Sequence, residues 1–100
     1  MVDLIRLHTK DGVEIVSDWY HSEQLSPRGV VLLHMMPADK KSWKTFATLL
    51  LEKNFQVLSI DLRGHGESYG GPQGYRNFSD KELQKSIFDV ETAVAFLKSK

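Results

Sequence analysis

Two short segments of this chain gather the residue types that carry out acid–base and nucleophilic chemistry. His34–Pro37 follows the apolar run Val30–Leu33, and Asp61–Ser68 follows the apolar run Phe55–Ile60. Imidazole, carboxylate and hydroxyl groups are the usual proton carriers and nucleophiles of enzymes. Sites in open α/β sheets lie at the carboxyl ends of the strands, so both segments are candidate parts of one site.

The sequence gives little support for a metal site or a nucleotide-binding site. No His-Glu-x-x-His or similar ligand pair occurs, and His8 and His21 show no metal-ligand spacing. A strand followed by Gly64–Gly66 suggests a dinucleotide site, but Tyr69 occupies the third glycine position of G-x-G-x-x-G. The next predicted helix also begins too far along the chain to reach a pyrophosphate. We therefore expect neither a metal site nor a dinucleotide site.

The composition excludes several classes of protein. Leu, Ile, Val and Phe make up 29 of 100 residues, well above the level of roughly 20% that is typical of disordered chains. Thirteen basic residues balance thirteen acidic ones, which argues against nucleic-acid or anionic-membrane binding. No apolar run could span a bilayer, and no signal peptide is visible. The absence of cysteine fits a reducing compartment, so we expect a cytoplasmic protein.

The elements that must position the two segments begin with a β-hairpin. Ile5–Thr9 and Val13–Ser17 alternate apolar and polar residues, and Asp11-Gly12 between them favours a tight turn with positive φ. Ser22–Arg28 is polar and is predicted to be a loop. Gly29–Leu33 is continuously apolar, which is typical of a strand buried on both faces of a parallel sheet.

A helix is predicted next. Asp39 or Ser42 can cap its start, and Asn54 can end it in the left-handed conformation. Phe55–Ile60 is the following buried strand, and Leu62–Asn77 is a glycine-rich loop. The apolar residues of the helix, which fall at i, i+3, i+4, i+7 and i+8, are Trp43, Phe46, Ala47, Leu50 and Leu51.

The second predicted helix, Ser79–Lys98, is the most clearly marked element. Ser79 and Glu82 form a capping box, and Phe78 can pack against Leu83. The complete order of strand, strand, strand, helix, strand, helix predicts a parallel α/β sheet with an antiparallel hairpin at one side. The apolar stripe of this helix is predicted to be Leu83, Ile87, Val90, Val94 and Leu97.

The two segments resemble motifs of the α/β-hydrolase family, and the chain is similar to the amino-terminal part of its esterase, lipase and peptidase-like members. That family carries His-Gly-x-Pro after its third strand and Asp-x-x-Gly-x-Gly-x-Ser after its fourth. This chain meets the patterns at His34 and Pro37 and at Asp61, Gly64, Gly66 and Ser68, with Met35 in the usual glycine position. The resemblance extends from the hairpin to the last helix.

The resemblance implies that residues 1–100 are the amino-terminal portion of a single α/β-hydrolase domain, ending before the nucleophile strand. In that fold, strand Phe55–Ile60 inserts between the hairpin and Gly29–Leu33, and the two helices cover opposite faces. The nucleophile, the acid and the catalytic histidine would then lie beyond Lys100. The outer edge of Gly29–Leu33 would lack a neighbour, so we expect the chain to self-associate through it.

The family role of the first loop is electrostatic. A backbone N–H just after the third strand forms half of an oxyanion hole, which binds the negative oxygen of a tetrahedral intermediate. On the matching position that donor would be the N–H of Met36, supported by His34, Met35 and Pro37. The alternative is that this segment is only a structural strand-to-helix turn.

Neither histidine in the two segments is expected to act as a base. His34 ends a buried strand, and the resemblance implies that it orients the loop by hydrogen bonding. His65 lies in the glycine turn, where Arg63 and Glu67 are available as local partners.

Gly66–Gly70 also matches G-x-S-x-G, the pattern of the family's nucleophile elbow. An elbow serine must directly follow its strand and directly precede its helix. Here Arg63–His65 intervene after the strand, and Gly70–Pro72 prevent a helix. All four histidines also precede Ser68, whereas the family order is serine, acid, histidine. We therefore interpret Ser68 as a turn-closing residue and Asp61–Ser68 as a structural turn.

The resemblance implies a parent serine hydrolase that acts on carboxylic esters or related small acyl compounds and needs no cofactor. The 100-residue chain alone is expected to be inactive. The alternative is that it is not an enzyme but a truncated product or a small binding module of hydrolase-like shape.

Overall fold

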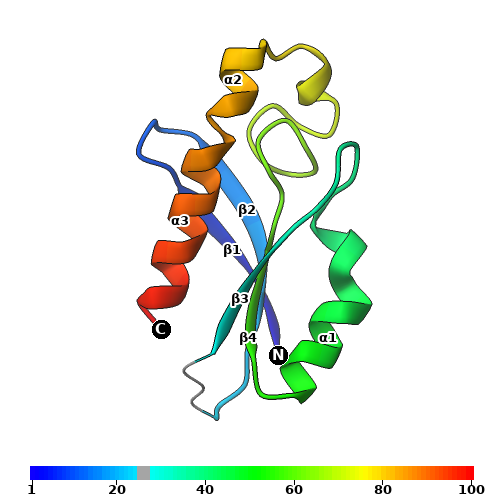
Figure 1. The fold of residues 1–100 in the computed structure, drawn as a ribbon, viewed down its shortest axis with the longest axis vertical. Coiled ribbons are helices and arrows are strands. Elements are labelled where there is room, and N and C mark those ends of the chain that lie inside the picture. The colour runs from blue at the N-terminus through cyan, green and yellow to red at the C-terminus, as the bar shows by residue number, and fades with distance from the viewer. Residues whose placement is uncertain (25–27) are drawn as a thin grey trace.

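The computed structural model describes residues 1–24 and 28–100, so part of the loop predicted at Ser22–Arg28 lies outside the described residues. A twisted four-stranded sheet lies between helices on its two faces (Figure 1). The strands are β1 Val2–His8, β2 Glu14–Tyr20, β3 Gly29–Leu33 and β4 Gln56–Ile60. The helices are α1 Lys44–Glu52, α2 Asp80–Gln84 and α3 Ser86–Lys98, with single 3-10 turns η1 Lys40–Trp43 and η2 Gly74–Arg76.

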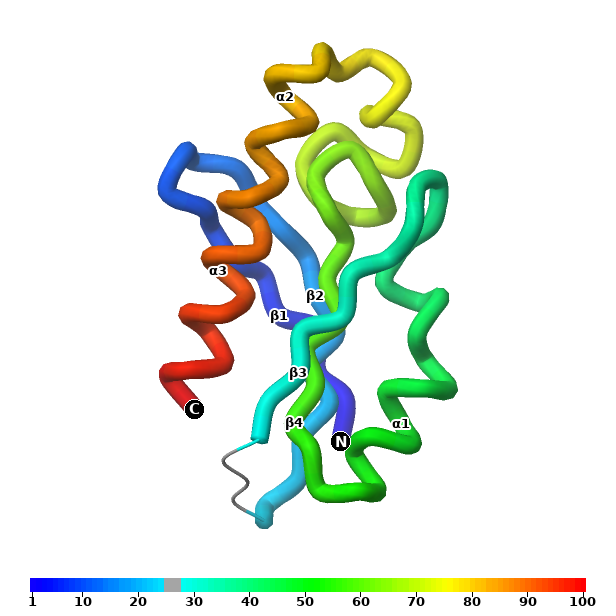
Figure 2. Tube along the Cα trace, viewed as in Figure 1, coloured from blue at the N-terminus to red at the C-terminus, as the bar shows by residue number. Residues whose placement is uncertain are grey.

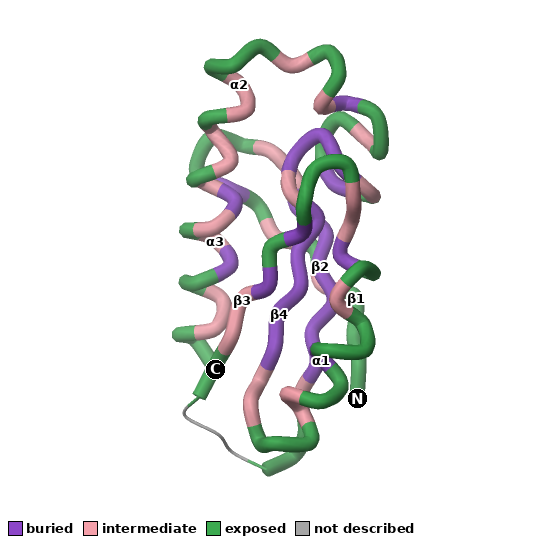
Figure 3. The backbone as a smooth tube through the Cα atoms, turned by 45° about the vertical axis from the view of Figure 1, so that its right-hand side comes forward, coloured by how far each residue is buried: buried purple, intermediate pink, exposed green. Residues whose placement is uncertain are grey.

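Strand β4 is central in the sheet, whose order is β1-β2-β4-β3. It runs antiparallel to β2, with Ser17 opposite Ile60, and parallel to β3, with Leu33 opposite Ile60. Because β4 has neighbours on both edges and helices on both faces, it is buried from Val57 onward (Figure 3). The predicted fold class is confirmed, including the insertion of this strand between β2 and β3.

The predicted hairpin is also confirmed. Strands β1 and β2 pair from Val2 opposite Tyr20 to His8 opposite Glu14. The Thr9 N–H donates to the Val13 carbonyl at 3.0 Å, which closes the turn. Gly12 has φ +88°, whereas Asp11 has an ordinary negative φ, so one position of the Asp-Gly pair uses the left-handed region.

Helices α1 and α3 pack on opposite faces of the sheet, as predicted (Figure 2). Alternation along β4 divides the core, because successive strand residues point to opposite faces. One cluster lies on the α3 side and consists of Ile15, Trp19, Leu58, Ile60 and Ala93. The other lies on the α1 side and consists of Tyr20, Leu32, Ala47 and Val57.

The ends of the first helical segment follow the sequence signals. The Asp39 carboxylate accepts from the Lys41 N–H at 2.9 Å and caps η1, which leads into α1. Asn54 has φ +69° and ends the segment in the predicted left-handed conformation. The predicted apolar stripe is wrong at Phe46, which is 46% exposed and contacts the Trp43 ring at the border of the buried face.

The last predicted helix needs two corrections. It is divided at Lys85 into α2 and α3, although Ser79 caps its start as predicted, accepting from the Glu82 N–H at 3.2 Å. The predicted stripe is also rotated from the buried face, since Ile87 is 56% exposed while Asp89 and Ala93 are fully buried. The physical reason is an ion pair, because Asp89 must face inward to reach the buried Arg63 guanidinium.

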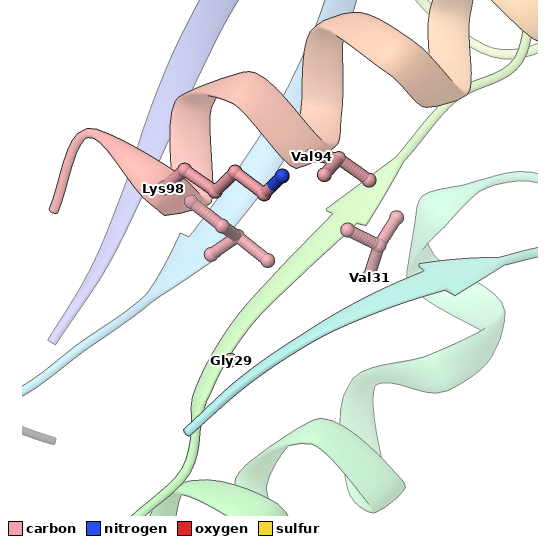
Figure 4. A pocket seen from close by; sticks show the side chains of 5 residues that line it. Gly29, Val31, Val94 and Lys98 are labelled. Carbon is pink, nitrogen blue, oxygen red and sulfur yellow. The ribbon is translucent and has the colours of Figure 1, made fainter. Parts of the chain in front are cut away.

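An open groove of about 390 Å³ lies between β3 and α3. Val31 of β3 and Val94 of α3 face it, and Lys98 extends along it (Figure 4). Among the described strands β3 pairs with β4 alone, so the outer edge of β3 has no partner strand beside an apolar surface. On β3 the Leu33 carbonyl also accepts from the Trp43 indole N–H at 2.9 Å. Such an edge is a template for pairing with another chain.

We propose that a second copy of the chain occupies this edge in solution. The average mass from sedimentation should rise with protein concentration, and Val94→Lys should lower it because the added charge lies in the groove. Ile87→Lys is the matched control, since Ile87 is exposed on the same helix and does not line the groove. A wild-type chain that stays monomeric at every concentration would contradict the proposal.

Candidate active site

The two chemistry-bearing loops leave the sheet at the same end (Figure 1). Strands β3 and β4 are parallel, and Leu33 pairs with Ile60. His34 and Asp61 therefore start their loops side by side. This brings the two sequence-predicted segments together, as expected for the carboxyl ends of parallel strands.

His34 contacts both loops through its two ring nitrogens, its own loop through Nδ1 and the loop after β4 through Nε2. Its Nε2 accepts from the Leu62 N–H at 3.0 Å, and its Nδ1 lies 2.9 Å from the Met35 carbonyl oxygen. Because Nε2 is an acceptor, the proton is assigned to Nδ1, which donates to Met35. The ring is buried, and both nitrogens are engaged with backbone groups. This arrangement suits a residue that orients a loop rather than a base.

The segment after His34 is the exposed part of the site. Met35 is 80% exposed and Met36 is about half exposed. The Met36–Pro37 peptide bond is cis. Met35 has a negative φ, so the methionine in the usual glycine position causes no left-handed strain. Within residues 1–24 and 28–100, no group accepts a hydrogen bond from the Met36 N–H.

Asp61 is a fully buried carboxylate that joins the same two loops. Its Oδ1 accepts from the Lys40 N–H at 2.6 Å. Its Oδ2 accepts from the Glu67 N–H at 2.9 Å and from the Lys40 ammonium at 3.3 Å. With donors on both oxygens, the Asp61 carboxylate has a structural role in the turn.

The glycine turn closes tightly around this carboxylate. Gly66 has φ +51°, and a Cβ at this position would collide with the Asp61 carboxylate. Gly64 has φ +80°, and a Cβ there would lie 2.8 Å from the Tyr75 backbone nitrogen. Both glycines are thus required by conformation and by close approach.

Ser68 closes the turn with a buried hydroxyl. Its Oγ donates to the Asp61 carbonyl at 2.6 Å and accepts from the Val16 N–H at 2.8 Å. Gly70 and Gly71 both have positive φ, so no helix follows directly. The hydroxyl is held between two backbones and is not exposed as a nucleophile must be.

His65 is buried against aromatic neighbours. It stacks on Tyr75 with ring centroids 4.9 Å apart, and its Nδ1 lies 3.1 Å from the Arg63 carbonyl oxygen. Among the described residues its Nε2 has no hydrogen-bond partner. Of the two expected local partners, Arg63 is confirmed through its carbonyl oxygen, whereas Glu67 is wrong because its carboxylate pairs with Lys40.

Arg63 forms a second buried charge cluster that the sequence did not reveal. Its guanidinium contacts Asp89 at 2.8 Å, Asp11 at 2.8 Å and Glu82 at 3.1 Å. The Asp11 pKa is lowered, chiefly by hydrogen bonding to Arg63, whereas burial raises the pKa of Asp89. The cluster ties the hairpin turn, α2 and α3 to the loop after β4.

Lys40 is the other residue that sequence reasoning missed. It is 2% exposed, and its ammonium contacts Glu67 at 2.6 Å as well as Asp61. No local pattern marks a lysine as buried, because its partners lie more than 20 residues away. For Asp89 a weak signal existed, since a helix face through Asp89, Ala93 and Phe96 also has helical spacing.

No cluster of three His, Cys, Asp or Glu side chains within the described part of the chain could hold a metal ion. At this end of the sheet the Met36 N–H is a hydrogen-bond donor without a partner among the described residues. That chemistry is electrostatic, because a fixed donor stabilises negative charge that develops on a bound oxygen.

No family model matches the chain, but solved structures resemble it closely. The Pyrococcus furiosus esterase Pf2001 superposes with a TM-score of 0.77 at 23% identity, covering 100% of this chain and 37% of the esterase. The Exiguobacterium antarcticum esterase EaEST superposes with a TM-score of 0.67 at 27% identity, covering 93% of this chain and 31% of that protein. The Vigna radiata epoxide hydrolase VrEH1 superposes with a TM-score of 0.73 at 18% identity, covering 97% of this chain and 29% of that protein.

The chain therefore spans about a third of the length of the proteins that it resembles. Its fold is that of the amino-terminal part of an α/β-hydrolase, which confirms the resemblance seen in the sequence motifs.

The close approach of Gly66 to the Asp61 carboxylate can be tested by substitution. Gly66→Ala combines a positive φ with a collision, and should reduce the free energy of unfolding by roughly 2–4 kcal/mol. Gly71→Ala is the matched control, because it has φ +73° but open space around it, and should cost only about 1 kcal/mol. Equal losses in urea unfolding would show that the Asp61 carboxylate does not constrain this position.

Asp11 should make stability depend on acid pH. A carboxyl whose folded pKa is depressed adds stability that is complete above its unfolded pKa and is lost as pH falls through the folded value. The ordinary Asp11 pKa is 3.8, so the wild-type free energy of unfolding should fall as pH drops below about 4.

The Asp11→Asn variant should be less stable than wild type at pH 7 but lose less on acidification. Urea unfolding between pH 7 and about 2.5 measures both slopes. Glu52→Gln, at an exposed carboxyl of α1, is the control and should follow the wild-type profile. An unchanged slope in Asp11→Asn would contradict the linkage.

Proposed function

We propose that this chain is the amino-terminal portion of a single α/β-hydrolase domain that cleaves carboxylic esters or related small acyl compounds. The observation that carries the proposal is the Met36 N–H. It has no partner among the described residues, and it belongs to a half-exposed residue in the loop after β3, at the carboxyl end of the sheet. The esterases among the structural neighbours support the same reaction class.

In the proposed reaction the Met36 N–H is one of two donors of an oxyanion hole. Attack on the acyl carbon turns the carbonyl oxygen into an oxyanion, which accepts a hydrogen bond from this N–H. The donor helps most when it is already fixed in place, because no reorganisation is then needed during the reaction. His34 and Pro37 flank the donor, and His34 is held by backbone groups of both loops.

The nucleophile, its acid and its histidine are proposed to lie on later segments of the domain. Ser68 is unsuited to the nucleophilic role, because its hydroxyl is buried and already makes two hydrogen bonds to backbone groups. The 100-residue chain alone is therefore proposed to be inactive and to contribute only one oxyanion donor. We place the protein in the cytoplasm and assign it no cofactor.

No helix in the described ranges is long and apolar enough to cross a membrane, and the formal net charge is zero. A small acyl molecule is thus favoured as partner over nucleic acid. An epoxide hydrolase is also among the neighbours, so the fold alone does not select ester cleavage. The alternative function is a non-catalytic truncated product or binding module of hydrolase-like shape.

The proposal is tested on the 100-residue chain and on the complete hydrolase domain in parallel. The chain alone should not turn over p-nitrophenyl acetate or butyrate, whereas the complete domain should do so and should react with a serine-directed phosphonate. In the complete domain Met36→Ala keeps the N–H and should retain most activity. Met36→Pro removes the N–H and should lower kcat about 100- to 1000-fold.

Three results would contradict the proposal. Turnover by the chain alone that disappears in Ser68→Ala would make Ser68 a nucleophile. A complete domain without ester turnover or phosphonate labelling would favour the binding module. Equal and complete loss of activity in Met36→Ala and Met36→Pro, with thermal melts showing both variants folded, would assign the role to the methionine side chain.

A further inference from the structure

Lys40 stands out among the lysines of the described residues, because it alone is buried. Lysine is almost never fully buried unless its charge is paired. Its ammonium contacts Glu67 at 2.6 Å and Asp61 at 3.3 Å, both on the loop after β4. The neighbouring Lys41 contrasts with it, since its side chain is 62% exposed and bonds Asp18 at 2.9 Å.

Backbone groups of Lys40 bind the same loop and strand. The Lys40 N–H donates to Asp61 at 2.6 Å, and the Lys40 carbonyl accepts from the Ser59 hydroxyl at 2.9 Å. The residue thus contacts β4 and its loop through its N–H, its carbonyl and its ammonium. No other residue of η1 makes so many contacts across to β4 within the described chain.

The location of Lys40 gives these contacts a consequence for the site. It begins η1 a few residues after Met36, so it anchors one end of the exposed segment, while His34 anchors the other end. Between the anchors lie Met35 and Met36, which point into solvent. The position of the Met36 N–H therefore depends on how firmly both ends are held.

We propose that Lys40 is a positioning residue, whose ammonium clamps the Met36 loop onto Asp61 and Glu67 and so fixes the direction of the Met36 N–H. The proposal rests on the proposed function, in which that N–H binds an oxyanion. Lys40 does not touch substrate and acts through the loop.

The charge state of the cluster supports the clamp at neutral pH. Burial alone would lower the Lys40 pKa, but its hydrogen bond with Glu67 and the charge of Asp61 outweigh burial and raise it. The same hydrogen bond lowers the pKa of Glu67. The Lys40 ammonium and the Glu67 carboxylate accordingly remain charged together at pH 7.

The test uses Lys40→Met, which keeps an unbranched side chain of nearly the same length and removes the charge. Backbone ¹⁵N order parameters are measured in the 100-residue chain for Met35, Met36 and the central strands. At Met36 the value should fall from the rigid level of about 0.85 to below about 0.6, while values in β2 and β4 stay unchanged. Lys41→Met is the matched control and should leave all values unchanged.

A second variant, Glu67→Gln, keeps the test decisive if Lys40→Met fails to fold. Glu67 is more than half exposed, so its loss should weaken the clamp without exposing the core. Glu67→Gln should lower the Met36 order parameter less than Lys40→Met does. Lys40→Arg, a separate variant that keeps the positive charge, should have the wild-type value. The proposal would be overturned if the folded variants kept the wild-type order parameter at Met36. It would also be overturned if the order parameters fell by the same amount throughout the sheet.

In the complete hydrolase, Lys40→Met should lower kcat at least tenfold and leave KM within about twofold, since a misplaced donor weakens transition-state binding alone. Equal changes in kcat and KM would contradict the positioning role of Lys40. A domain with no ester turnover would defeat the proposed function instead, and the order parameters would still decide whether Lys40 holds the loop.

Discussion

The buried carboxylate of Asp61 is the constraint on which this end of the molecule depends. An ionised group without water is costly unless neighbouring donors satisfy it. Here the donors come from two separate loops, as the Lys40 and Glu67 backbone N–H groups and the Lys40 ammonium. The shapes of both loops follow from that demand. Gly66 must lack a side chain because the chain wraps directly against the anion.

Arg63, two residues further along, organises the opposite side of the fold. Its guanidinium is fully buried and meets carboxylates from the hairpin turn and from the helical segment after the glycine loop. The two charged residues therefore connect different parts of the fold. Asp61 joins the loop after β3 to β4, and Arg63 joins the β1–β2 hairpin to α3. One short loop after the central strand thus connects all layers of the structure.

Local signals in the sequence predicted the elements well, because each depends on near neighbours in the chain. Gly12, Asn54 and Ser79 have the backbone or capping roles that their types suggest. The parallel pair and the grouping of the two loops followed from apolar runs and strand order.

Two of the errors arose where distant charges decide which side chains are buried. Hydrophobic spacing alone placed Ile87 inward on α3, but the demand of Arg63 for Asp89 rotates that helix. The burial of Lys40 could not be predicted from its own surroundings, since its partners belong to a loop after the next strand. The long-range ion pairs of Lys40 leave no local pattern in the sequence around it.

The sheet order also has a consequence for synthesis on the ribosome. The hairpin β1–β2 can pair as soon as it emerges, but β3 is hydrogen-bonded to β4, which comes later in the chain. At roughly 5–20 residues per second, residues 34–55 take about one to four seconds to appear. During that interval the apolar run Val30–Leu33 has no partner strand, and this is a period in which chaperone binding would protect the nascent chain.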